Sequence, residues 1–128
     1  MGITEFRNKK FSFKIDDGIV YCDLLTEFVD YDLVNEGVKK RLEIYDDNLY
    51  PMISDISKLK SLTKEARQRL AEKDGLIGLT ALAIISKTRL HVFISNVYHQ
   101  IFKVSIPVKN FTCKEEAVKW TQKYRLQR

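Results

Sequence analysis

The residues best suited to chemistry lie in one basic segment near the middle of the chain. Ser61 and Thr63 carry hydroxyl groups there, among lysine and arginine side chains. Such hydroxyls suit a phosphorylation or anion site, because the start of a helix offers free N–H donors and a positive dipole end. The alternative is structural, with Thr63 as the N-cap of the following helix. The candidate partner- or anion-binding residues are Ser57, Lys58, Lys60, Ser61, Thr63, Lys64 and Arg67.

Other potential catalytic or metal-binding groups are isolated. His91 and His99 are the only histidines, and no cysteine or carboxylate stands near them at ligand spacing. A pair of histidines alone is a poor metal site, so we expect neither a metal nor a cofactor. Cys22 falls on an alternating strand pattern and is predicted to be a core thiol rather than a nucleophile. No nucleophile elbow or phosphate-binding loop occurs, so we predict that the protein is not an enzyme.

Length and composition indicate one ordinary domain spanning residues 1–128. Hydrophobic residues make up 45% of the 128 positions, which is enough for a core without disulfide or metal support. The net charge of +5 comes largely from two basic clusters, within residues 58–73 and 114–128. The aromatic residues fall at core-like spacings instead of alternating with these bases, so we expect no nucleic-acid binding.

The N-terminal residues and the cysteine content favour a cytoplasmic protein. Residues 1–10 contain charges but no apolar core of a signal peptide. The longest apolar run, residues 76–85, is interrupted and too short to span a bilayer, so no membrane insertion is expected. Two cysteines without motif spacing fit a reducing compartment.

The first half of the chain predicts a hairpin followed by a helix. Apolar and polar residues alternate over 11–15, Asp17-Gly18 gives a strong turn signal, and residues 19–25 are typical of the second strand. Asp30 and Asp32 provide capping oxygens for a helix. Its buried stripe is predicted to be Val34, Val38, Leu42 and Tyr45, with Lys39, Lys40, Arg41 and Glu43 on the polar side.

The second half alternates strands and helices. We expect strands over 50–56, 79–85 and 106–109, the last at a sheet edge because of Pro107. Helices are expected after Thr63, over 90–103, and after a capping box formed by Thr112 and Glu115. The last helix should bury Ala117, Trp120 and Tyr124. The order β-β-α-β-α-β-α-β-α predicts an α/β fold with about four helices on a mixed, mostly parallel five-stranded sheet.

Two short motifs, together with this order, resemble the STAS domain of anti-sigma factor antagonists and small SpoIIAA-like proteins. The segment Phe111-Thr112-x-x-Glu115-Glu116-Ala117-x-x-Trp120 is similar to the tail of many SpoIIAA-like proteins. Asp55-Ile56-Ser57 resembles the strand end before the functional loop of the family. The resemblance implies a STAS-like fold over nearly the whole chain.

The resemblance also implies a regulatory role that involves no catalysis. In anti-sigma factor antagonists an Asp-Ser-Ser-Gly type loop is phosphorylated by a partner kinase. The stretch here, residues 60–65, keeps the hydroxyls of Ser61 and Thr63 but lacks the acidic residue and the glycine. We therefore expect a protein-binding module that acts through residues 57–67, with another protein as its partner. The pattern does not decide between a monomer and a homodimer.

The alternative function is carriage of an apolar or lipid ligand. Lipid-binding CRAL-TRIO (Sec14-like) domains are similar in architecture to SpoIIAA-like proteins. A pocket between the sheet and the helix predicted over 90–103 would favour this alternative.

Overall fold

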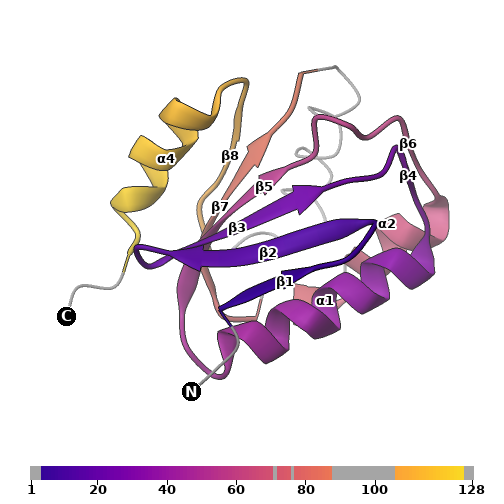
Figure 1. Ribbon diagram of the computed structural model, residues 1–128, viewed down its shortest axis with the longest axis horizontal. Helices are drawn as coiled ribbons and strands as arrows, with labels where there is room; N and C mark the ends of the chain where they lie inside the picture. Colours follow the sequence, from indigo (N-terminus) through magenta and orange to yellow (C-terminus); the bar gives the residue numbers. More distant parts are fainter. Residues whose placement is uncertain (1–3, 71, 76, 88–105, 126–128) are drawn as a thin grey trace.

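The computed structural model describes residues 4–70, 72–75, 77–87 and 106–125, which form a sheet with helices on both faces (Figure 1). The strands are β1 (Glu5–Arg7), β2 (Phe11–Asp16), β3 (Ile19–Leu24), β4 (Phe28–Val29), β5 (Tyr50–Asp55), β6 (Ser61–Leu62), β7 (Leu79–Ile85) and β8 (Val108–Phe111). The helices are α1 (Tyr31–Tyr45), α2 (Lys64–Leu70) and α4 (Lys114–Gln122), with a 3₁₀ turn, η1 (Lys73–Gly75).

The large sheet has the strand order β1-β2-β3-β5-β7-β8. Strands β1, β2 and β3 are antiparallel neighbours, and β3, β5, β7 and β8 run parallel. The mixed α/β architecture agrees with the sequence prediction, but the five-strand count is wrong because β1 adds a sixth strand. Only three residues long, with Glu5 and Arg7 at its ends, β1 is too short to show an alternating apolar pattern.

The predicted hairpin turn is present at Asp17 and Gly18. Both residues have positive φ, 52° and 75°, which is the conformation that a two-residue turn between twisted strands requires. Arg125 then closes over the turn, since its Nη1 lies 2.6 Å from Asp17 Oδ2 and donates to the Asp17 carbonyl at 3.1 Å. The C-terminal part of the described chain is thereby attached to the first hairpin.

Local signals fix both ends of α1. Asp30 is the N-cap, and its Oδ1 accepts a hydrogen bond from the Leu33 amide at 2.9 Å. At the other end Asp46 and Asp47 adopt left-handed conformations, with φ of 46° and 63°, which stops the helix. Gly78 must be glycine beside this end, because its φ is +85° and a Cβ would lie 2.7 Å from the Tyr45 ring.

Side chains of the large sheet alternate between its two faces, and both faces carry hydrophobic clusters. Helices α1 and α2 cover one face, which includes Phe11, Phe13 and Val20. Helix α4 packs on the other face, against Ile19 and Ile53 among others. Figure 1 shows α4 separated from α1 and α2 by the sheet. The core therefore has two layers, as the alternation of strands and helices predicts.

The predicted capping box of the last helix is wrong. The residue before α4 is Cys113, in an extended conformation with φ of −139°, and it makes no side-chain cap hydrogen bond. The helix thus begins one position later than expected, so Glu115 takes the second helical position instead of the third that a capping box requires. Ala117 is fully buried, as predicted.

Trp120 of α4 and Tyr124, which follows the helix, are only partly buried, in contrast to the prediction. The rings of Trp120 and Tyr124 are in contact, with centroids 4.9 Å apart and planes tilted by 56°, and Trp120 also contacts Phe111 at 5.6 Å. The fully buried positions of the helix are Ala117 and Thr121 instead. Small side chains let the helix axis approach the sheet and leave the larger rings at its rim.

The described residues contain three α-helices where about four were expected. The helix predicted over 90–103 lies outside the described residues. None of the described helices is long and apolar enough to cross a membrane.

Candidate functional site

The candidate segment, residues 57–67, is attached to the chain before α1 by a small second sheet. Strands β4 and β6 pair in parallel, with Phe28 opposite Ser61 and Val29 opposite Leu62. The amides of Lys60 and Ser61 both donate to the Glu27 carbonyl, at 2.7 and 3.2 Å. These contacts give the segment a defined backbone even though it leaves the main sheet.

Thr63 has the structural role that the alternative interpretation gave it. Its Oγ1 accepts a hydrogen bond from the Ala66 amide at 3.0 Å, which caps the first turn of α2. Its own amide donates to the Val29 carbonyl at 3.1 Å. The hydroxyl of Ser61, in contrast, is exposed and makes no hydrogen bond within the described residues. Of the two hydroxyls, Ser61 is therefore the one accessible to a partner.

The basic residues of the segment differ in how far they are engaged. Lys60 forms an ion pair with Glu27, with Nζ 2.6 Å from Oε2, and the hydrogen bond to Glu27 raises the pKa of Lys60. Lys58 and Lys64 are exposed and form no ion pair within the described ranges, and Arg67 is half-buried. The segment thus presents less uncompensated positive charge than its sequence suggests.

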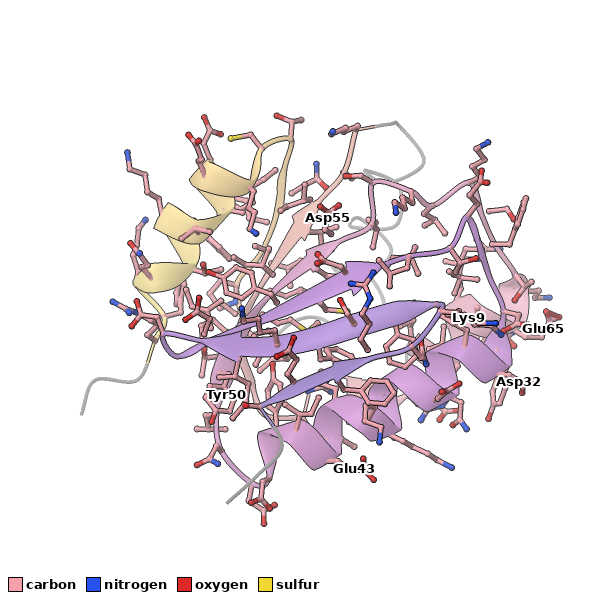
Figure 2. All side chains as sticks on the ribbon, viewed as in Figure 1. Lys9, Asp32, Glu43, Tyr50, Asp55 and Glu65 are labelled. Carbon is pink, nitrogen blue, oxygen red and sulfur yellow. The ribbon has the colours of Figure 1, made fainter. Side chains whose placement is uncertain are left out.

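Ser57 lies where β5 leaves the sheet. Its amide donates to Asp55 Oδ1 at 2.9 Å, and its hydroxyl oxygen is buried with no hydrogen-bond partner among the described residues. Ser57 and Lys58 line a hollow of about 300 Å³ at the carboxyl ends of β3 and β5, which Asp23 and Lys114 also line. Figure 2 shows Asp55 at this end of β5. The hollow offers charges of both signs.

Two exposed aromatic rings beside the segment were not predicted. Phe28 has 65% of its surface exposed, and Tyr31, at the start of α1, has 43%. Phe28 is held next to Ser61 by the β4–β6 pair. Figure 2 shows Asp32 of α1 and Glu65 of α2 at the same end of the molecule, so the starts of both helices meet there. The sequence signal, an aromatic residue between Glu27 and Asp30, is too short to show that the ring faces solvent.

A separate apolar cavity of about 160 Å³ lies between α1 and the sheet. Its walls include apolar side chains from α1, α2 and six strands, together with a few polar residues. The polar residues and glycines that line it are Cys22, Gly37, Arg41, Ser54 and Gly75. Burial raises the pKa of the Cys22 thiol to about 12, so this group stays protonated and behaves as part of the core.

Arg41 is buried, whereas the sequence predicts it on the polar side of α1. Only 2% of its surface is exposed. Its Nη1 donates to the Ile77 carbonyl at 2.6 Å and its Nη2 to the Asp74 carbonyl at 2.9 Å. The guanidinium also lies 4.9 Å from the centre of the Tyr45 ring. Backbone carbonyls within and just after η1 therefore hold this charge inside the protein, and the helical pattern of α1 contains no sign of them.

The described residues include no cluster of three or more potential metal ligands. His91 and His99 lie outside the described residues. Cys22 and Cys113 are both free and partly buried.

Comparison with known proteins places the chain in a family. The family described as domain of unknown function DUF7793 matches residues 13–125. The chain belongs to this family. No curated protein matches it.

Among solved structures, the chain is similar to a crystal structure of an uncharacterized protein of the DUF3478 family, with a SpoIIAA-like fold, from Shewanella loihica PV-4. The TM-score is 0.65 at 16% sequence identity, over 87% of this chain and 91% of that chain. The likeness confirms the SpoIIAA-like fold that the sequence motifs indicated.

Proposed function

We propose that this protein is a non-enzymatic regulatory module that binds another protein through residues 57–67 and the adjoining strand β4. The observation that carries the proposal is the exposure of Phe28, whose ring stands in solvent beside Ser61. Aromatic side chains are enriched at protein interfaces and supply much of the binding free energy when a partner covers them. Tyr31 provides a second exposed ring at the start of α1.

The charges around Phe28 favour a partner with acidic side chains. Lys58 and Lys64 belong to the segment, are exposed and form no ion pair within the described residues. Such charges contribute to the rate and specificity of association more than to affinity. The polar hollow lined by Ser57 and Lys58 would accept a polar side chain of the partner.

Ser61 is the position through which binding would be regulated. Its hydroxyl is accessible, whereas the hydroxyl of Thr63 is occupied as a helix cap. A phosphoryl group on Ser61 would place negative charge beside Phe28 and would repel an acidic partner. The resemblance to anti-sigma factor antagonists agrees with a switch of this kind.

The test is affinity capture from the native lysate, followed by binding measurements with the purified partner. Phe28→Ser should weaken binding by about thirtyfold or more, which is the effect of removing an interface hot spot. Leu49→Ser is the matched control, because Leu49 is also exposed (49%) but lies just before β5 instead of in the segment. Both variants should change the free energy of unfolding by less than about 0.5 kcal/mol.

Equal binding by Phe28→Ser and Leu49→Ser would overturn the proposed surface. For the switch, Ser61→Glu should weaken binding and Ser61→Ala should leave it unchanged. A loss of binding in both Ser61 variants would mean that the hydroxyl is a contact and not a switch.

A second function, the carriage of a small apolar ligand, is supported by the cavity beneath α1. Its volume of about 160 Å³ is close to the roughly 150 Å³ of an engineered apolar cavity that binds benzene. Native mass spectrometry of the purified protein should then show a bound molecule that is lost on denaturation. A spectrum of the unliganded mass alone, before and after incubation with small aromatic compounds, would overturn this second function.

A further inference from the structure

A buried positive charge, Arg41, lines the apolar cavity and forms no ion pair within the described residues. Arg41 is 2% exposed, and among the described residues no carboxylate lies within ion-pair distance of its guanidinium. The neighbouring Asp74 carboxylate is already engaged by Arg69, through two hydrogen bonds of 2.7 and 3.0 Å. Buried charges are ordinarily paired, so this one is unusual.

The hydrogen bonds of Arg41 leave part of its guanidinium available. The group carries five N–H donors. Two of them take the carbonyls of Ile77 and Asp74, and the plane of the group lies near the Tyr45 ring. Guanidinium groups bind carboxylates through paired, charge-assisted hydrogen bonds, which are the strongest contacts that remaining donors can form.

Gly37 opens the space beside this charge. It lies one helical turn before Arg41 in α1, and both residues line the cavity. Residues at this spacing share one helix face. A Cβ added at Gly37 would have no described atom within 4 Å, so the missing side chain leaves room. Glycine has a poor helix propensity, and nothing in the backbone of α1 requires it here, since its φ is not positive.

We propose that this cavity binds a small apolar carboxylate, whose carboxylate group contacts Arg41 and whose apolar body fills the space next to Gly37. The inference rests on the second function proposed above and adds the chemistry of the ligand. The cavity volume of about 160 Å³ suits a body the size of one benzene ring. The apolar walls, among them Val38 and Leu82, lower the local dielectric around the ion pair and thereby strengthen it.

The test titrates the full-length protein with benzoate and with benzyl alcohol, which has similar size but no charge. Binding is followed by calorimetry and by the amide shifts of ¹⁵N-labelled protein. Benzoate should bind about tenfold to a hundredfold more tightly than benzyl alcohol, as expected for a charge-assisted hydrogen bond. Arg41→Met should remove this preference. Lys39→Met, which removes an exposed charge from the same helix, should keep it.

A second variant keeps the test valid if Arg41→Met does not fold. Gly37→Leu should fill the cavity and abolish binding of both compounds while the protein stays folded. Equal affinity of the wild type for benzoate and benzyl alcohol would overturn the role of Arg41. The second function, carriage of a neutral apolar ligand, would then still stand. Absence of binding by either compound would overturn both this inference and the second function.

Discussion

Replacement of Gly37 by alanine should stabilise the protein. Glycine in the middle of a helix costs about 1 kcal/mol relative to alanine, because the unfolded chain has more conformations to lose. Gly37 lies inside the 15-residue helix α1, and an added Cβ would meet no described atom within 4 Å, so no steric cost opposes the gain. The new methyl group would also find few packing partners, so its burial adds little. We therefore expect a gain of about 1 kcal/mol.

Urea denaturation at neutral pH measures this effect. The midpoint of unfolding should rise with an unchanged m-value, and the melting temperature should rise by about 4 °C, as expected for a chain of this size. Gly78→Ala is the matched control, since the same methyl group would lie 2.7 Å from the Tyr45 ring at a φ of +85°. That control should lose about 2 kcal/mol or more.

A loss of stability in Gly37→Ala would refute the reasoning, because it would mean that the space beside Gly37 is occupied. A gain in both variants would refute the conformational argument for Gly78.

Three further substitutions test the energetics of individual contacts. Asp74→Ala should lower the free energy of unfolding by about 2 kcal/mol at neutral pH, because it leaves the buried Arg69 without its paired hydrogen bonds. This loss is smaller than the usual 3–5 kcal/mol for breaking a buried ion pair, because a third of the Asp74 side chain is exposed. The hydrogen bond from Arg69 lowers the pKa of Asp74 below its usual value of 3.8. This contribution is therefore present above the unfolded pKa and lost as the pH falls through the folded pKa, so the difference between wild type and variant should shrink in unfolding curves measured at increasingly acid pH. Thr63→Ala should cost about 1 kcal/mol in thermal denaturation through the lost N-cap, and an unchanged stability would show that the cap contributes nothing. Trp120→Ala should cost about 2 kcal/mol in urea, less than the 3–5 kcal/mol of a fully buried aromatic, because the ring is only partly buried.

Features of the fold that depend on local sequence were predicted well. The turn at Asp17 and Gly18 and the N-cap at Asp30 need only neighbouring residues, and both are confirmed. Strand β7 follows from its continuous apolar run, because a central strand is covered on both faces. The hydroxyl of Thr63 likewise acts on an amide three positions away.

Features that depend on distant parts of the chain were missed. The β4–β6 pair joins two-residue strands that are far apart in sequence, and neither contains enough residues for a period to appear. The burial of Arg41 depends on carbonyls of Asp74 and Ile77, which lie more than 30 positions away. The exposed ring of Phe28 is a consequence of the β4–β6 pair. The exposed ring beside the candidate segment and the buried charge beside the cavity thus both depend on contacts between distant parts of the chain.

The order of strands in the large sheet bears on how the protein assembles during its synthesis. From β1 to β8 the strands lie side by side in the order in which the ribosome makes them. Each new strand can therefore join the free edge of the part already formed, and none has to be inserted between two earlier strands. Growth from one edge keeps unpaired strands few at every chain length, which limits aggregation of the nascent chain. Contacts that join the end of the chain to the first hairpin, such as the one between Arg125 and Asp17, which spans 108 positions, must wait until nearly the whole chain has emerged.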